Sequence, residues 1–178
     1  MSVLEAIGTR RSVRSYSDKP IDDEDAKKIL DAARLAPSGG NLQRWSFVYV
    51  KDSQVLRMIK NCSPGFYGGA TAAIVICIDA ETDPYGSTSY SMVRIMDVGF
   101  AAENILLAAH SLGLGGCAIA SFNEGCISRV INAQKNWRPI LVIALGYPDK
   151  PPQMPSKKSL SELVYLDEFG KKWDAMEG

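Results

Sequence analysis

The chain has 178 residues, of which 46% are hydrophobic and 22% charged, a composition typical of one globular domain rather than of a disordered chain. Lysine plus arginine equals aspartate plus glutamate at 20 each, so net charge gives no reason to expect nucleic acid or an anionic membrane as a partner. No apolar run is long enough to span a bilayer and no signal-peptide pattern begins the chain, so we expect a cytoplasmic protein without a membrane partner.

A short helix is expected first, from Ser2 to Thr9, with Ser2 as its N-cap and Glu5 at the capping-box spacing. The basic segment, residues 10–16, follows with the sequence Arg10-Arg11-Ser12-Val13-Arg14-Ser15-Tyr16. Its guanidinium and hydroxyl groups can bind a phosphate or the edge of a planar heterocycle. A basic cluster this short is also typical of a solvated surface, so the segment alone leaves both interpretations open.

A second helix is expected from Asp22 to about Ala36, because acidic residues crowd its N-terminal end and Pro37 stops it. The glycine loop, residues 38–45, follows with the sequence Ser38-Gly39-Gly40-Asn41-Leu42-Gln43-Arg44-Trp45. Two adjacent glycines allow the backbone to approach a ligand closely. A plain connection to the next strand would explain Pro37 and one glycine, but not the whole polar set.

The middle of the chain alternates strands and helices. We expect a strand at 46–51, a helix from Asp52 or Ser53 to about Asn61, a loop at 63–69, a buried strand at 70–79 and a polar, mobile loop at 81–89.

The longest helical pattern, residues 90–112, carries apolar residues on two sides. A wide seam holds Ile95, Val98, Ala102, Ile105, Leu106 and Ala109, and a narrow seam holds Met96, Phe100 and Leu107. The second side packs either against a partner subunit or, if the helix lies in the core, against its own chain.

Glycines at 113–116 are expected to end this helix, and because they follow a helix rather than a strand they do not form a dinucleotide-binding turn. The remaining expected elements are a strand at 117–120, a helix from Asn123 to Ile131, a strand at 140–145, an extended tail at 150–158 and a helical turn at 160–164. The alternation favours a mixed sheet flanked by helices in a single domain, residues 1–178.

Several kinds of catalytic machinery are missing from the sequence. It has no P-loop motif, and its one histidine, His110, lies within a helix, which favours a structural role over a hydrolytic triad. The four cysteines (62, 77, 117 and 126) lack metal-binding spacing, and we expect reduced, mostly packed thiols, with zinc or a disulfide as the remote alternative. Cationic and glycine-rich elements without nucleophile or metal ligands indicate a bound cofactor that carries the chemistry.

Taken together, these segments resemble the nitroreductase family of FMN-dependent oxidoreductases. The similar segments are residues 10–16, Ala36-Pro37-Ser38 through Trp45, Asp97-Val98-Gly99 with Ala102 to Ala109, Gly113-Leu114-Gly115, and Leu145-Gly146-Tyr147-Pro148. The resemblance implies an α+β fold with a central mixed or antiparallel sheet flanked by helices. It also implies an intertwined homodimer, with FMN at each subunit interface and residues 150–178 as a tail reaching toward the partner subunit.

The resemblance implies a phosphate site near the start of the chain. Arg10 and Ser12 would hold the FMN phosphate, with Arg11 nearby. Lys157 or Lys158 would close on the same phosphate from the tail.

The flavin ring is implied to meet three other parts of the chain. Arg14 would face the pyrimidine side of the isoalloxazine, and the backbone at Ala120-Ser121 would lie near flavin N5. No side chain would be catalytic in its own right, and no metal would be bound. The residues that would approach from the other subunit are Pro37, Ser38, Gly39 and Asn41.

The implied reaction is ping-pong hydride transfer from NADH or NADPH through FMN to a small-molecule acceptor, such as a nitroaromatic or a quinone. Arg44 replaces a frequent Pro, Ala120 a frequent Glu and a tail Lys a frequent Arg, which leaves donor and acceptor preference open. One alternative is an FMN-binding module or dimer with little or no turnover, favoured by Arg44 and by the Phe66-Tyr67 loop. Another is a protein-interaction dimer without a cofactor, which leaves the glycine loop unexplained.

Overall fold

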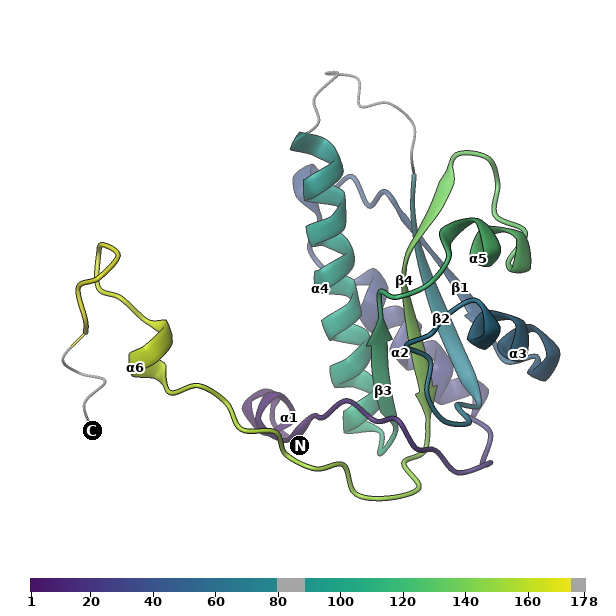
Figure 1. Cartoon of the computed structure of the whole chain (residues 1–178), viewed down its shortest axis with the longest axis horizontal. Helices are drawn as coiled ribbons and strands as arrows, with labels where there is room; N and C mark the ends of the chain where they lie inside the picture. Colours follow the sequence, from purple (N-terminus) through teal and green to yellow (C-terminus); the bar gives the residue numbers. More distant parts are fainter. Residues whose placement is uncertain (80–88, 174–178) are drawn as a thin grey trace.

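A four-stranded antiparallel sheet forms the middle layer of the protein, and helices cover both of its faces (Figure 1). The computed structural model describes residues 1–79 and 89–173. The strand order is β1-β2-β4-β3, which confirms the α+β fold and selects the antiparallel arrangement. The strands are β1 (Trp45–Val50), β2 (Ala72–Asp79), β3 (Gly115–Ile119) and β4 (Trp137–Gly146), and the helices are α1 (Val3–Thr9), α2 (Asp23–Arg34), the 3-10 turn η1 (Gly39–Asn41), α3 (Ser53–Asn61), α4 (Ser89–Ser111), α5 (Glu124–Val130) and α6 (Leu160–Leu163).

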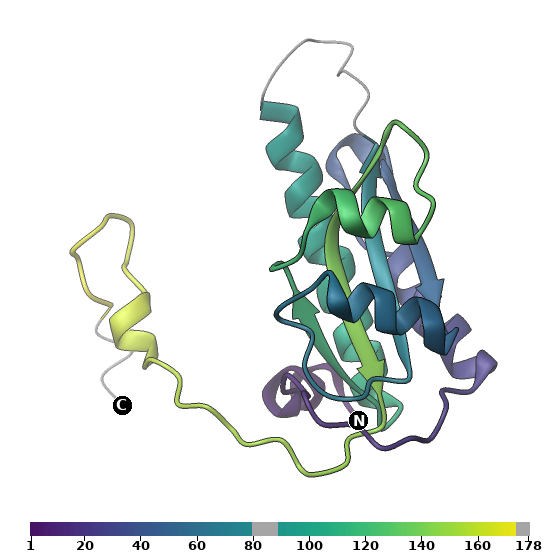
Figure 2. The ribbon, with the colours of Figure 1, turned by 45° about the vertical axis from the view of Figure 1, so that its right-hand side comes forward.

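Two hydrophobic cores lie on opposite faces of the sheet. Ile74 and Ile76 of β2 pack into the core formed with α2 and α4. Ala73 and Val75, the alternating residues, pack into the core formed with α3 and α5, which Figure 2 shows on the near side of the sheet. Burial on both faces explains why β2 reads as a continuous apolar run rather than as an alternating pattern.

The predicted helix starts are confirmed by their caps. Ser2 and Glu5 form a capping box at α1, and the Asp22 and Asn123 side chains cap α2 and α5. At α3 the cap is Asp52, whose Oδ1 accepts hydrogen bonds of 2.9 Å from the N–H groups of Gln54 and Val55. These signals are local in sequence, which is why they are readable without the fold.

Strand β4 begins at Trp137, earlier than the predicted 140. Pro139 within it has no N–H to donate, and the register with β2 shifts between Ile76 and Cys77, the residue opposite Pro139. Ile140 has no partner in β2 in this register, so β4 itself carries a bulge next to the proline, a position where a sheet tolerates the missing N–H.

Strand β3 begins at Gly115, so the prediction that glycines 113–116 only end the preceding helix is wrong for the last two. A Cβ atom at Gly115 would lie 2.3 Å from Cγ2 of Val13. The glycine therefore allows the basic segment to lie against β3, where Val13 N–H donates to Gly116 O at 3.0 Å. Gly113, with φ +78°, makes the turn out of α4.

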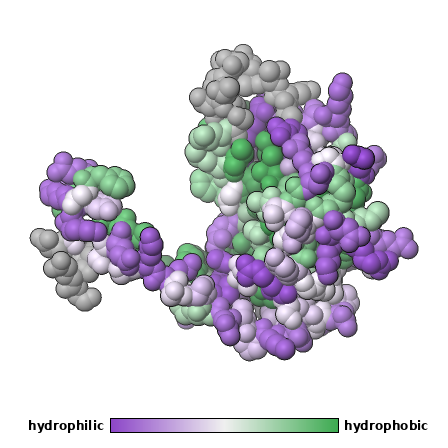
Figure 3. Space-filling model, in the orientation of Figure 1, coloured by the Kyte–Doolittle hydropathy of each residue, from purple (hydrophilic) through white to green (hydrophobic). Residues whose placement is uncertain are grey.

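Helix α4 buries one apolar side and exposes the other. Val98, Ala102, Ile105, Leu106 and Ala109 are buried as expected, but the placement of Ile95 in the same seam is wrong, because 52% of its surface is exposed. The interpretation of α4 as a helix enclosed on both sides by its own chain is also wrong. Figure 3 shows apolar residues gathered along the upper part of this helix; those exposed are Met92, Ile95, Met96 and Phe100.

The C-terminal segment leaves the body of the protein after β4 and runs past α1 to α6, which stands apart from the sheet (Figure 1). Its apolar side chains have little cover, and Phe169 is 94% exposed. The loop predicted at 81–89 lies outside the described residues, except for Ser89 at the start of α4.

The expectation of four reduced cysteines is wrong for two of them. Cys62 and Cys126 form a disulfide with their Cα atoms 5.9 Å apart, and 64 residues of sequence separate them. Spacing alone does not reveal such a pair, because the fold brings the end of α3 to the start of α5. Cys77 and Cys117 are free and buried, as predicted.

Candidate functional site

The basic segment lines a cavity of about 530 Å³ between α1, α4 and the C-terminal segment. The structure brings Arg10, Arg11, Ser12 and Arg14 together with Lys157, whereas Lys158 is not among the lining residues. Three guanidinium groups, a hydroxyl and an ammonium group form a donor set that fits an anion such as phosphate. The other lining residues are Ile7, Glu103, Gln153 and Pro155.

An acidic side chain that the sequence did not assign to the site lies in the same cavity. Glu103 of α4 accepts a hydrogen bond of 3.1 Å from Arg10 Nε. This leaves the two Nη groups of Arg10 for an anion, while the carboxylate fixes the direction of the guanidinium plane. Glu103 and Arg10 are 93 residues apart, and no motif links them, so only the packing of α1 on α4 reveals the pair.

His110 holds α1 against the C-terminal half of α4. Its Nε2 lies 2.8 Å from Thr9 Oγ1, and because the Thr9 hydroxyl donates to Glu5 O at 2.6 Å, the imidazole N–H is the donor to Thr9. Burial, with the nearby Arg10 and Arg11 charges, lowers the pKa of His110. A neutral ring in this position supports the structural role expected from the sequence. Its hydrogen bond to Thr9 holds the residue that directly precedes the basic segment.

The glycine loop is held against the N-terminal half of α4. Gly39 N–H donates to both carboxylate oxygens of the buried Asp97, at 3.1 and 3.2 Å. A Cβ atom at Gly39 would lie 2.5 Å from Cγ1 of Val93, so a larger residue would require the Val93 side chain to move. Gly40 and Asn41 both have positive φ angles, 59° and 56°.

In the part of the chain that the structure describes, the basic segment and the glycine loop lie against different parts of α4. They contact α4 at Glu103 and Asp97, six positions apart, which places the contacts about 9 Å apart along the helix and on faces about 120° apart. Pro37 and Ser38 belong to the same side as Gly39. The residues expected to approach a ligand from two sides are therefore separate in the single subunit.

Ala120 and Ser121 follow directly after the end of β3. Ser121 lines a second cavity, of about 800 Å³, with Cys62, Cys126 and Phe122 among its neighbours. The loop after α3 approaches closely, because a Cβ atom at Gly65 would lie 2.3 Å from Ser121 Oγ. The basic segment contacts β3 near its start, and Ser121 lies just beyond the end of β3. The edge strand β3 therefore runs from the cavity of the basic segment to the cavity lined by Ser121.

In residues 1–79 and 89–173, no group of three or more His, Cys, Asp or Glu side chains is arranged to hold a metal ion. In the same residues, no helix has both the length and the apolar character needed to cross a membrane.

The chain is similar to known proteins in both sequence and structure. The sequence model of the Nitroreductase family matches residues 7–64 and 59–147. A protein of Archaeoglobus fulgidus, provisionally named NADH dehydrogenase/NAD(P)H nitroreductase, is 41% identical over 154 residues, which cover 82% of this chain and 84% of that protein. The NADPH-flavin oxidoreductase of Vibrio harveyi is 27% identical over 179 residues, 94% of this chain and 75% of that protein. The solved FMN-dependent nitroreductase of Clostridium difficile R20291 has a TM-score of 0.81 at 29% identity and covers 94% of this chain and 100% of its own.

Proposed function

The chain belongs to the nitroreductase family, and we propose that it is an FMN-dependent enzyme in which NAD(P)H and an oxidised acceptor use one flavin pocket in turn. Membership makes it an NAD(P)H-dependent oxidoreductase. The observation that carries the cofactor assignment is the cavity in which Arg10, Ser12, Arg14 and Lys157 converge. FMN, when bound, would accept a hydride from NAD(P)H and supply electrons to an acceptor such as a nitroaromatic or a quinone.

The donor set of this cavity fits the phosphate end of FMN. Arg10 and Ser12 offer charge-assisted and neutral hydrogen bonds, Arg11 adds charge, and Lys157 closes the cavity from the C-terminal segment. Glu103 is a like charge for a phosphate, but its pairing with Arg10 reduces that repulsion. We assign the phosphate to Lys157 rather than to Lys158, which does not line the cavity.

Arg14 and the Ala120-Ser121 backbone are the groups that we assign to the flavin ring. A cation about 4 Å from a site of developing negative charge interacts by about 4 kcal/mol at an effective dielectric constant of 20, before desolvation is subtracted. Arg14 on the pyrimidine side would therefore favour electron uptake. The phosphate ligands anchor the cofactor at a distance from the reacting atoms.

A second copy of the chain completes the proposed site. The glycine loop residues Pro37, Ser38, Gly39 and Asn41 would then reach the flavin held by the partner's basic segment. Two features support this homodimer: the exposed apolar side of α4, and the C-terminal segment, whose leucine and aromatic side chains have little cover in the described chain. Apolar surface of this extent is typical of protein interfaces.

We favour turnover over the alternative of an FMN-binding module because of two contacts. Arg44, which could have blocked the pocket, pairs with Asp79 at 3.3 Å at the end of β2. Phe66 is buried in the core beside α3, although Tyr67 is exposed. We therefore propose turnover, in the cytoplasm, where NAD(P)H is available; the choice between NADH and NADPH rests with experiment.

A visible spectrum followed by anaerobic reduction tests the proposal. Protein purified with FMN is expected to be yellow and to bleach rapidly with NADH or NADPH. Addition of a quinone should then restore the absorbance. Protein that fails to bind FMN at micromolar concentration contradicts the cofactor assignment, and a bound flavin that neither nucleotide bleaches contradicts turnover.

A further inference from the structure

We propose that the Cys62–Cys126 disulfide is a thiol–disulfide exchange site for small thiols, and that its redox state sets how firmly the connection from β3 to α5 is held. This inference rests on the proposed function in one respect only. That connection carries Ser121, which we assign to the flavin.

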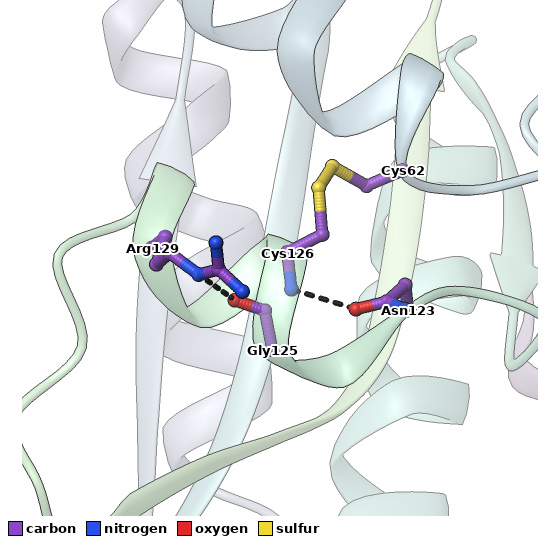
Figure 4. The surroundings of a disulfide bond; sticks show 5 residues. All are labelled: Cys62, Asn123, Gly125, Cys126 and Arg129. Carbon is purple, nitrogen blue, oxygen red and sulfur yellow. Dashed lines mark hydrogen bonds between the residues drawn. A yellow bond between two sulfur atoms is a disulfide. The ribbon is translucent and has the colours of Figure 1, made fainter.

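The disulfide joins two helices on the same face of the sheet (Figure 4). Cys62 is the residue that ends α3, and Cys126 lies in the first turn of α5. Cys62 is buried and Cys126 is partly exposed. Both line the open cavity of about 800 Å³, so a small molecule can reach the sulfur pair from solvent. Access of this kind distinguishes an exchangeable disulfide from one sealed in a core.

The unequal exposure gives the exchange a direction. The thiolate of an incoming thiol attacks Cys126 Sγ, a new S–S bond forms, and the Cys62 sulfur leaves as a thiolate that takes a proton from solvent. A second thiol molecule attacks the external sulfur of the mixed disulfide and releases an external disulfide. Cys126 is then a thiol. Two thiols have supplied two electrons and the protein disulfide has accepted them.

Arg129 places a positive charge in the same cavity. Its Nε donates to Gly125 O at 3.2 Å, which holds the side chain across the turn that contains Cys126 (Figure 4). A thiolate is the attacking species in thiol–disulfide exchange, and a fixed guanidinium raises the local concentration of an anion. Arg129 would therefore speed the first step without touching the bond that breaks.

The other two cysteines provide an internal contrast. Cys77 is buried in β2, and burial raises the pKa of its thiol to about 11. Cys117 is buried in β3. A buried thiol is out of reach of thiols and disulfides in solution, so neither residue is expected to exchange in the folded protein.

The disulfide is connected to Ser121 through short contacts. Asn123 N–H, two residues after Ser121, donates to Cys62 O at 2.8 Å. Gly65, three residues after Cys62, packs against the Ser121 side chain. Opening the S–S bond leaves these segments joined by hydrogen bonds and packing alone, so the position of the Ser121 backbone becomes less restricted. Disulfides are rare in the cytoplasm, and there they are usually transient, catalytic or redox-sensing.

Alkylation of the folded protein tests the exchange and needs no FMN. After treatment with dithiothreitol and its removal, N-ethylmaleimide should label Cys126, while Cys77 and Cys117 should react only after unfolding. With glutathione disulfide, the Cys62→Ser variant should form a mixed disulfide at Cys126, and Cys126→Ser should leave Cys62 unmodified. A Cys62–Cys126 bond that resists dithiothreitol until the chain unfolds overturns the proposal, as does equal glutathione uptake by the two variants.

The rate of exchange has a matched control on the other helix. Arg129→Gln should slow reduction of the disulfide by glutathione about threefold or more, as expected for loss of one attracting charge at short range. Arg57→Gln removes an exposed charge from α3, outside the cavity, and should leave the rate unchanged. Equal rates in both variants contradict the role of Arg129.

FMN affinity tests the coupling to Ser121. In a flavin-fluorescence titration, anaerobic reduction of the wild type should weaken FMN binding about fivefold, while Cys62→Ser/Cys126→Ser should not respond to the reductant. Unchanged affinity on reduction overturns the coupling. Failure of both redox states to bind FMN contradicts the proposed function instead, and the alkylation result still decides the exchange.

Discussion

Arg10 has one donor edge committed to Glu103 and the remainder facing the cavity. If the Nη groups that face the cavity bind the FMN phosphate, Arg10→Gln should weaken FMN binding about tenfold, the loss of one charge-assisted hydrogen bond. Riboflavin lacks the phosphate, so its weaker binding should not change. Fluorescence titrations with both ligands provide the measurement, and Arg34→Gln, an exposed arginine on α2, is the matched control. Equal losses for FMN and riboflavin would place Arg10 at the ring instead.

Asp97 is a buried carboxylate whose two oxygens accept from the backbone of Gly39. Asp97→Ala leaves that N–H without its acceptor and should lower the free energy of unfolding by about 1–3 kcal/mol. Asp97→Asn keeps an acceptor and should recover most of the loss. Urea denaturation measures both variants, and a similar loss in the two would show that the charge matters more than the hydrogen bond.

The pH dependence of α1 docking depends on His110. Burial and the charges of Arg10 and Arg11 lower its pKa in the folded state below the ordinary value of 6.5. The group therefore stabilises the fold above pH 6.5, and this contribution is lost as the pH falls below that value, because the unfolded state binds the proton more readily. His110→Gln should remove this part of the pH dependence of thermal stability. Because His110 is the one histidine in the chain, proton NMR of its ring gives the pKa directly, and a value at or above 6.5 would contradict the prediction.

At the scale of elements, the N-cap of α3 is the feature whose contribution to the stability of the fold can be estimated most directly. Asp52 Oδ1 accepts from two backbone N–H groups, so Asp52→Ala should cost about 1 kcal/mol of stability. Asp52→Ser, another capping residue, should restore most of it. The shift of the urea midpoint at constant slope is the measurement. An unchanged midpoint in Asp52→Ala would show that packing of α3, rather than its cap, fixes the start of the helix.

Elements whose signals are local were predictable from sequence, and elements that depend on a distant partner were less so. The capped helix starts were predicted because donor and acceptor lie within three residues of each other. The predicted start of β4 is too late because Pro139 is typical of a strand boundary, and the bulge at Ile140 that accommodates it forms only when β4 pairs with β2. The sequence places Gly115 only at a helix end because Val13, the residue that requires this glycine, is about a hundred residues away.

The residues of the candidate site also separate into those that the sequence predicts and those that only the fold brings together. The basic segment and the glycine loop are each contiguous, so their residue types point to a ligand without the fold. Glu103 joins the site through helix packing, and the Cys62–Cys126 pair forms because α3 and α5 share a face of the sheet. Neither relation leaves a pattern in one sequence.

At the scale of the whole molecule, the proposed homodimer depends on the exposed side of α4. Phe100→Glu places a charge on that side and should convert the dimer to a monomer in sedimentation, with weaker FMN binding because the partner's glycine loop is lost. Met58→Glu, on an exposed position of α3, should leave the dimer intact. A wild-type monomer that holds FMN tightly would contradict the shared site.

The order β1-β2-β4-β3 also constrains how the protein is made. Strand β4, the latest in the chain of the four described strands, lies between β2 and β3, so β3 has no neighbour in this sheet until Trp137–Gly146 has left the ribosome. A nascent chain that ends before that point carries an unpaired, apolar strand edge, which is the kind of surface that chaperones bind and that aggregates form from. Release of the C-terminal third, rather than completion of any helix, is therefore the event that lets this chain close its sheet.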